Sequence, residues 1–420
     1  MSDVIANMGS SAKVIISLAI MLFAGFLITR ISKKLRLPNV TGYIVAGILI
    51  GPYLLNLIPQ EIIVGMDFVT DIALSYIAFG VGKYFKFSTL KKSGSKVLTI
   101  TLFESLTAAI AVIFAMVYVF KLPMSFALLL GAIGCATAPA STIMTIRQYH
   151  AKGDFVNTVL QVVALDDAVS LFAFSICAAI AQSLNGQLAL DYKVFLIPLV
   201  MNLLVVMLGI LLGLLLNKLI NNKRSKEHSL VLVNAVILSL TGFCAFFDIS
   251  PLLGCMALGT AYINISGNKE LFKRLNSFSP PILLLFFVIS GMKLDVPSLA
   301  TAGVIGVGYF FIRIIGKYAG SYIGAKVSKS STEIKKYLGL ALVPQAGVSI
   351  GLAALGQRLL PTELGTMLST IILSSAVLYE MIGPACAKAS LLLSGVITET
   401  EDNEPQNVEV DDNTSNNQSP

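Results

Sequence analysis

Two adjacent aspartates, Asp166 and Asp167, lie in the middle of an apolar segment, and no other feature constrains the fold of this chain as strongly. The segment, residues 156–180, reads VNTVLQVVALDDAVSLFAFSICAAI, and about 20 apolar residues are enough to cross a bilayer as a helix. Carboxylates at mid-membrane depth are costly unless they face water, a cation or a counter-charge. We therefore interpret the pair as a functional site, with a helix-packing or salt-bridge role as the alternative.

The composition places the rest of the chain in the same setting. Hydrophobic residues make up 55% and charged residues 13% of 420 positions, whereas soluble domains carry about 25% charged residues. The net charge of +7 does not indicate nucleic-acid binding, because the basic residues lie in short loops between apolar blocks. The cysteines lack paired spacing and predict packing residues rather than a metal cage or disulfides. No cofactor and no resident metal ion is expected.

The apolar pattern predicts an all-α polytopic membrane protein with about thirteen transmembrane helices. The predicted segments are 12–29, 40–56, 62–82, 97–120, 124–146, 154–183, 193–217, 229–247, 251–266, 279–294, 299–325, 335–357 and 364–394. Loop charge tests this count, because the odd-numbered loops hold 22 Lys and Arg residues and the even-numbered loops hold 4. Since basic loops face the cytoplasm, the N-terminus is expected outside and the C-terminus inside.

The chain divides into a transmembrane domain, 1–398, and an acidic tail, 399–420. The tail contains seven acidic residues, no basic residue and many Asn and Ser. Such a segment cannot bury a core and is expected to be disordered and cytoplasmic.

Two predicted spans are interrupted in corresponding places. The fifth carries Pro139 in its middle and the twelfth carries Pro344 and Gln345, and each proline removes a backbone donor. The second and ninth spans share a five-residue glycine step, at Gly42/Gly47 and Gly254/Gly259. Paired interrupted helices predict an inverted repeat with a substrate site at the midplane. Simple kinks and close helix packing through glycine are the alternatives.

Two basic residues, Arg313 and Lys317, lie deep inside the eleventh span. A cation at that depth needs a partner, and the aspartate pair is the candidate by depth. If Arg313 is the partner, it stabilises an ionised carboxylate but carries no proton; if Lys317 is the partner, it can also carry one. Adjacent residues on a helix point about 100° apart, so one aspartate is expected to face the ion path and the other Arg313 or a helix end.

These charges predict a mechanism. A buried carboxylate holds a proton or a small cation, and the two compete for the same negative charge. If the occupied site can face either side in turn while the empty site cannot, cation and proton move in opposite directions, which is antiport.

The residues resemble the monovalent cation:proton antiporters of bacteria, in the NapA-like and Kef-like branch. The matching stretches are LPNVTGYIVAGILIGP, CATAPAST, VVALDDAVSL, SPPILLLFFVISGMKLD, RIIGKYAG and LVPQAGVSIGLAALG, in family order across nearly all of 12–394. The resemblance implies a dimerisation part, a mobile core with two crossed broken helices, an elevator-like movement and a homodimer in the bacterial inner membrane. No C-terminal nucleotide-binding domain of the Kef-like kind is expected.

The resemblance also implies roles for single residues. Asp167 matches the ion-binding carboxylate, and Asp166 matches the position that is aspartate in electrogenic relatives. Thr137 falls beside the ion site at the first break, and Arg313 matches the basic position of the eleventh helix.

An antiporter for Na⁺ and/or K⁺ is the expected function, and three other functions are its alternatives. A cation channel or a sodium-coupled symporter of similar architecture would move cations without counter-transported protons. An intramembrane aspartyl protease needs aspartates on two separate facing helices, whereas here they are neighbours. The chain is therefore not expected to be an enzyme.

Overall fold

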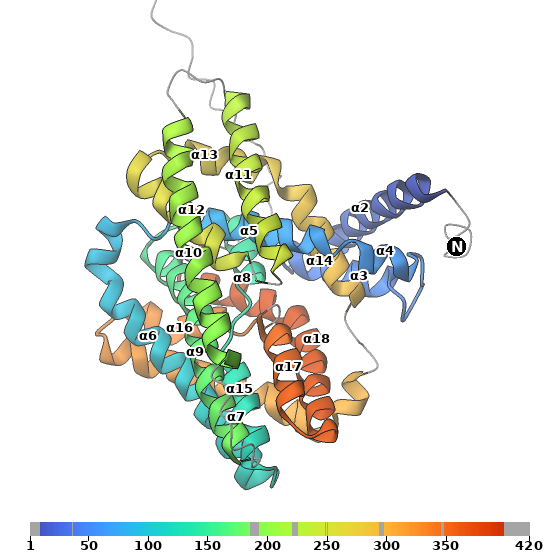
Figure 1. Cartoon of the computed structure of the whole chain (residues 1–420), viewed down its shortest axis with the longest axis vertical. Helices are drawn as coiled ribbons and strands as arrows, with labels where there is room; N and C mark the ends of the chain where they lie inside the picture. The colour runs from blue at the N-terminus through green and yellow to red at the C-terminus, as the bar shows by residue number, and fades with distance from the viewer. Residues whose placement is uncertain are drawn as a thin grey trace, which may run out of the picture.

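A computed structural model of the chain describes residues 9–398 except 36, 185–192, 221–225, 248, 250, 294–297 and 346–347. The predicted tail, 399–420, lies outside the described residues. All regular structure in the described part is helical (Figure 1). The helices are α2 (Ser10–Lys34), α3 (Asn39–Ile50), α4 (Gln60–Gly65), α5 (Asp67–Gly82), α6 (Phe87–Phe114), η1 (Ala115–Val119), α7 (Met124–Gly134), α8 (Pro139–Gln148), α9 (Asp154–Leu184), α10 (Lys193–Leu219), α11 (Lys226–Phe246), α12 (Leu252–Ser266), α13 (Glu270–Phe278), α14 (Pro280–Lys293), α15 (Ser298–Val327), α16 (Thr332–Ala341), α17 (Val348–Leu359) and α18 (Thr362–Leu393).

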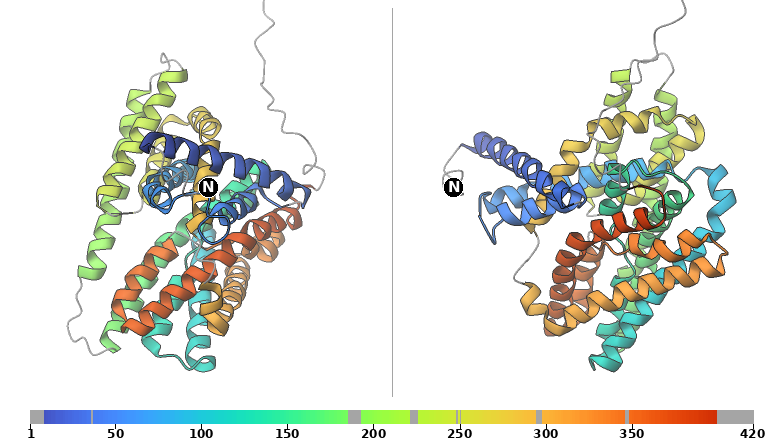
Figure 2. Two further views of the ribbon diagram at one scale, coloured as in Figure 1. Left: turned by 90° about the vertical axis from the view of Figure 1, so that its right-hand side faces the viewer. Right: turned by 180° about the vertical axis from the view of Figure 1, so that it is seen from behind.

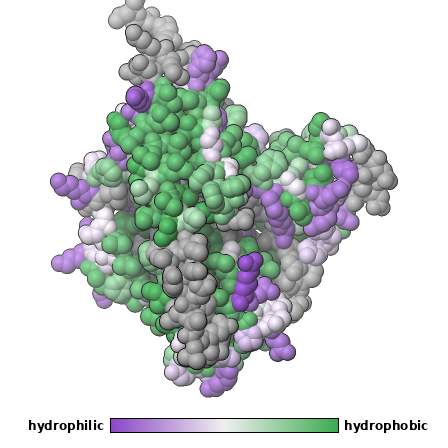
Figure 3. Space-filling view, in the orientation of Figure 1, coloured by the Kyte–Doolittle hydropathy of each residue, from purple (hydrophilic) through white to green (hydrophobic). Residues whose placement is uncertain are grey.

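Each of the thirteen predicted segments is occupied by one helix or by two successive helices. Within the described residues, 8 helices are long and apolar enough to cross a membrane, or 9 when α13 and α14, bent by 54°, count as one span. The shorter apolar helices α3 and α12 add to these. Apolar side chains also cover the outer face over α10 and α11 (Figure 3), as expected where lipid replaces water. The predicted all-α membrane fold is confirmed.

The helices form two groups that meet along one face. The first group, here called the scaffold, contains α2 to α5 and α10 to α14, which contact one another extensively. The second group, here called the core, contains α6 to α9 and α15 to α18. The core lies below the scaffold in Figure 1, and the view from behind in Figure 2 shows α2 extending away from it. The contacts between the groups come mainly from α3 and α5 against α8 and α18.

The two halves of the chain use glycine in matching ways. In the scaffold, α3 packs on α14 as α12 packs on α5. A Cβ atom on Gly47 would overlap the backbone of Val288, and a Cβ on Gly259 would overlap the backbone of Phe79. Glycine therefore lets each pair of backbones touch, as in other close helix crossings in membranes. The shared glycine step marks equivalent packing positions in two inverted halves.

The interrupted spans cross at their breaks. Residues 135–138 separate α7 from α8, and residues 342–347 separate α16 from α17. The backbone N–H of Ala138 donates to the carbonyl oxygen of Pro344 at 2.9 Å, and the Gln345 amide donates to the carbonyl of Ile133 at 3.0 Å. Pro139 begins α8, where its missing N–H leaves no bond unmade. The prolines therefore mark true breaks rather than kinks.

Arg313 of α15 joins the two breaks. Its guanidinium donates to the carbonyls of Gly134 at 3.0 Å, Val343 at 2.8 Å and Ala136 at 2.5 Å. Gly134 ends α7, and Ala136 and Val343 lie in the breaks just beyond the C-terminal ends of α7 and α16, where a helix carries partial negative charge. The guanidinium also lies over the Tyr379 ring of α18, 4.6 Å from its centroid. One buried cation thus satisfies carbonyls that the unwound backbone exposes in an apolar interior.

Replacing Gly47 with alanine should destabilise the scaffold, because the new methyl group meets backbone atoms of α14 that cannot move aside. We expect a loss of about 1–3 kcal/mol, typical of overpacking, measured as a lower melting temperature in detergent. Gly242→Ala is the matched control, since nothing lies within 4 Å of its added Cβ. Equal melting temperatures for the two variants would contradict the packing argument.

Replacing Arg313 with alanine should lower the melting temperature in detergent more than Arg358→Ala, an exposed arginine on α17. The loss leaves three buried carbonyls without a donor, at about 1–3 kcal/mol each before relaxation. A melting temperature equal to that of the Arg358 variant would show that the breaks hold together without this guanidinium.

Candidate functional site

Lys317 of α15 lies between two buried carboxylates from different helices. Its ammonium nitrogen is 2.8 Å from Oδ2 of Asp166 on α9 and 2.7 Å from Oε2 of Glu104 on α6. All three side chains are fully buried. Because charges in a low-dielectric interior need compensation, α6, α9 and α15 are tied together at this point by opposite charges.

The neighbouring groups complete the surroundings of Lys317. Its ammonium donates to the Thr137 hydroxyl at 3.0 Å and also to the carbonyl of Cys135, both in the break between α7 and α8. The Ser105 hydroxyl lies 3.0 Å from Oε1 of Glu104 and donates to Oδ1 of Asp166. The ammonium thus faces four oxygen acceptors, although it has three protons to donate. The two acids therefore compete for one cation.

Asp167 differs sharply from its neighbour. The side chain is 2% exposed, and neither of its oxygens has a hydrogen-bond partner among the described residues. Its backbone carbonyl accepts from the Ser170 hydroxyl at 2.8 Å, as part of ordinary helix geometry. A carboxylate buried in this way is unstable as a bare anion, so Asp167 needs a proton or a cation.

The structure decides between the two basic residues that the sequence left open. Lys317 contacts Asp166, whereas Arg313 is bound to backbone carbonyls of the two breaks. The expectation that one aspartate faces Arg313 or a helix end is therefore wrong for Arg313. The two residues are one helical turn apart on α15, which is about 5.4 Å along the axis, so each side chain meets a different set of groups.

Sequence reasoning missed several polar groups at this site. Glu104 and Ser105 stand in the apolar segment 97–120, where an acid carries the same signal as the aspartate pair. Tyr309 also went unnoticed, although its hydroxyl donates to the Gln345 side chain at 3.0 Å. Two buried hydroxyls without a hydrogen-bond partner among the described residues, Ser141 and Ser349, lie in the first turns of α8 and α17.

The charge balance limits what this arrangement can do. Three buried carboxylates, Glu104, Asp166 and Asp167, face a single ammonium group, that of Lys317. With every group ionised, two negative charges would remain in an apolar interior, which is strongly unfavourable. The site can therefore take up protons or small monovalent cations, and oxygen ligands suit hard cations.

Comparisons with known proteins agree with this chemistry. The sodium/hydrogen exchanger transmembrane family model matches residues 18–385. The probable Na⁺/H⁺ antiporter GerT of Bacillus cereus is 24% identical over 347 residues, covering 78% of this chain and 86% of GerT. The Na⁺/H⁺ antiporter of Enterococcus hirae is 22% identical, covering 81% and 89% of the two chains. The Na⁺/H⁺-K⁺ antiporter GerN of Bacillus cereus is 23% identical, covering 81% and 87%.

A solved structure shares the fold. The sodium proton antiporter MjNhaP1 from Methanocaldococcus jannaschii superposes with a TM-score of 0.65 at 20% identity, covering 91% of this chain and 99% of that one. The family match extends from α2 to α18 and includes both breaks and the acidic pair. The chain therefore belongs to the sodium/hydrogen exchanger family.

Proposed function

We propose that this protein exchanges a monovalent cation, Na⁺ and/or K⁺, for protons across the membrane, with cation and proton competing for Asp167. The observation that carries the proposal is the pair of Asp167 oxygens, buried and without a hydrogen-bond partner among the described residues. The names of the relatives, two Na⁺/H⁺ antiporters and one Na⁺/H⁺-K⁺ antiporter, support the same exchange.

The ion pair between Asp166 and Lys317 also takes part in the proposed competition between cation and proton, because Asp166 can change its partner when a cation binds. An incoming cation near Asp167 attracts the neighbouring carboxylate of Asp166 and weakens its pairing with Lys317. Glu104, 2.7 Å from the ammonium, can then keep Lys317 paired. Because Lys317 stays compensated in both arrangements, Asp166 changes partner without leaving a bare charge in the interior.

The two helix groups suggest how the site reaches both sides. All of the site residues belong to the core, whereas the scaffold supplies the facing surface. We propose that the core moves as a unit against the scaffold, in an elevator-like step, with the crossed breaks carried along. We also propose a homodimer in the bacterial inner membrane, with the N-terminus outside and the C-terminus in the cytoplasm, because the odd-numbered loops hold most of the basic residues.

The central test is Asp167→Asn, which removes the competing charge while keeping the shape of the side chain. In proteoliposomes with a trapped pH dye, wild type should move protons when Na⁺ or K⁺ is added, and the variant should be silent. Asp154→Asn is the matched control, since it removes an exposed aspartate from the same helix and should respond like wild type.

The same assay separates an antiporter from its alternatives. A cation channel or a sodium-coupled symporter would take up labelled cation without an opposing proton signal. Cation uptake without that signal, or an unchanged response in Asp167→Asn, would refute the proposed exchange.

Replacing Glu104 with glutamine tests the change of partner. Lys317 would then depend on Asp166 alone, so the cation must compete with a stronger ion pair. We expect the cation concentration for half-maximal exchange to rise about 3- to 10-fold, equivalent to about 1 kcal/mol of lost charge compensation. Glu363→Gln, which removes an exposed acid from α18, should leave that concentration unchanged. A Glu104 variant with wild-type cation dependence would rule out the exchange of partners.

A further inference from the structure

Four cations gather at one end of the molecule, where the core meets the scaffold. This basic patch consists of Lys83 directly after α5, Arg147 in the last turn of α8, Lys152 between α8 and α9, and Lys269 before α13. Burial and the other three cations lower the pKa of Lys83 to about 8. No ion pair joins any of the four to a carboxylate in the part of the chain that the structure describes. No direct ion pair therefore offsets their mutual repulsion; the nearest acids in sequence are Asp154 and Glu270, and Glu270 pairs with Arg274.

The basic patch spans the junction between the two helix groups. Arg147 and Lys152 belong to the core, and Lys83 and Lys269 belong to the scaffold. The Arg147 guanidinium lies so close to the backbone of Gly80 on α5 that a Cβ there would overlap it. An anion bound to all four cations would therefore hold core and scaffold together.

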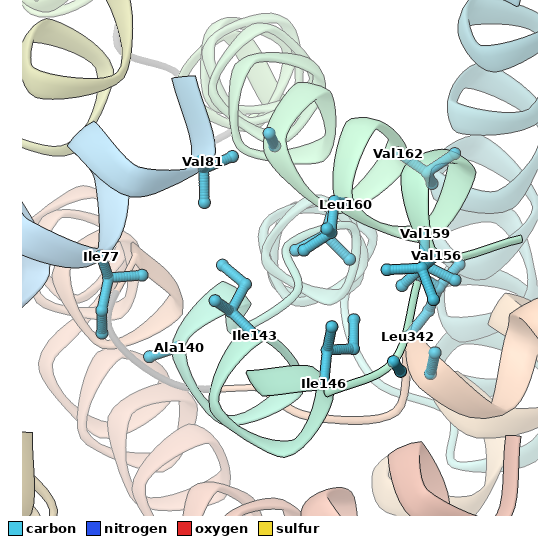
Figure 4. Close-up of a cluster of buried hydrophobic side chains, with 14 of the residues drawn as sticks. Ile77, Val81, Ala140, Ile143, Ile146, Val156, Val159, Leu160, Val162 and Leu342 are labelled. Atoms are coloured by element: carbon cyan, nitrogen blue, oxygen red, sulfur yellow. The ribbon is translucent and has the colours of Figure 1, made fainter. Parts of the chain in front are cut away.

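The last described residues of the chain pack in a buried cluster that also contains residues adjacent in sequence to this patch. Ile397, 4% exposed, packs in the same buried cluster as Phe85 and Ala151, which stand two and one positions from Lys83 and Lys152. Figure 4 shows side chains of this cluster from α5, α8 and α9, including Val81 and Ile146, which precede Lys83 by two positions and Arg147 by one. In the sequence, the acidic tail, 399–420, follows directly after Thr398, two positions beyond Ile397 of this cluster.

The charge and the length of the tail make it suitable for binding to the basic patch. It carries seven acidic residues and no basic residue, whereas the patch carries four cations that form no ion pair among the described residues. Ten residues of a random-coil chain span roughly 17 Å on average, and a short tether between two binding partners gives an effective concentration on the order of millimolar. At such an effective concentration, several ion pairs that are each weak are sufficient to keep the tail bound to the patch.

We propose that the acidic tail of this chain docks on the basic patch formed by Lys83, Arg147, Lys152 and Lys269, and restrains the core against the scaffold. The tail then acts as an autoinhibitory element that slows cation–proton exchange. The docking contact stands on its own, whereas the inhibition rests on the proposed antiport.

A binding experiment tests the docking without any transport. The protein truncated after Thr398 is titrated in detergent with a fluorescent peptide of residues 399–420, using choline chloride to vary ionic strength. We expect saturable binding that weakens with salt. The pair Lys152→Glu/Lys269→Glu should weaken it about 10-fold or more, from the loss of two contacts and the added repulsion.

The control is the pair Lys326→Glu/Lys329→Glu, which makes the same charge change at two exposed positions, one in the last turn of α15 and one just after it, and should bind like the unmodified truncated protein. Absence of binding, or equal weakening by both pairs, would overturn the docking. The Asp167→Asn protein should bind the peptide normally, so a failure of the proposed antiport leaves this measurement intact.

A transport experiment tests the inhibition. In phosphatidylcholine vesicles, truncation after Thr398 should raise the rate of cation-driven proton movement several-fold over the full chain. The Lys152→Glu/Lys269→Glu pair should raise the rate of the full chain similarly and add nothing to the truncated protein. Equal rates for full-length and truncated protein would overturn the autoinhibition. If phosphatidylglycerol slows both proteins through the same lysines, the patch binds lipid instead.

Discussion

The burial of ionic charge in an apolar interior is the constraint on which the rest of this structure depends. Lys317 is fully buried with Glu104 and Asp166, and Asp167 lies beside them without a hydrogen-bond partner among the described residues. Each of these groups would be unfavourable alone. The Lys317 ammonium needs oxygen acceptors in this interior, and besides the two acids the unwound backbone between α7 and α8 supplies one at the carbonyl of Cys135.

The two helix breaks, in turn, need hydrogen-bond donors. Interrupting α7–α8 and α16–α17 leaves carbonyl groups that no helix satisfies, and Arg313 binds three of them. The two buried cations of α15 thus have different tasks. Arg313 holds the crossing together, while Lys317 sets the charge balance beside Asp166. A single turn of helix separates a structural cation from one that meets the acids, which explains why depth alone could not distinguish them.

Much of the architecture was predictable because membrane folding leaves strong local signals. Apolar length, loop charge and Pro139 with Pro344 marked the spans and breaks, since each depends only on neighbours in sequence. The partner of Asp166 was not predictable in this way, because Arg313 and Lys317 have nearly the same sequence context. Glu104 was missed for a different reason: its signal was present, but its importance depends on meeting Lys317 from 213 positions away.

The sequence alone determined that this chain crosses a membrane many times, breaks two helices and carries two adjacent acids in the middle of an apolar segment. It did so because the hydrophobic effect and the loss of a backbone donor at proline act along the chain. Only the tertiary structure decided which cation meets which acid, and that Asp167 has no described partner. Those outcomes depend on side-chain reach across packed helices, where a difference of one helical turn changes the partner.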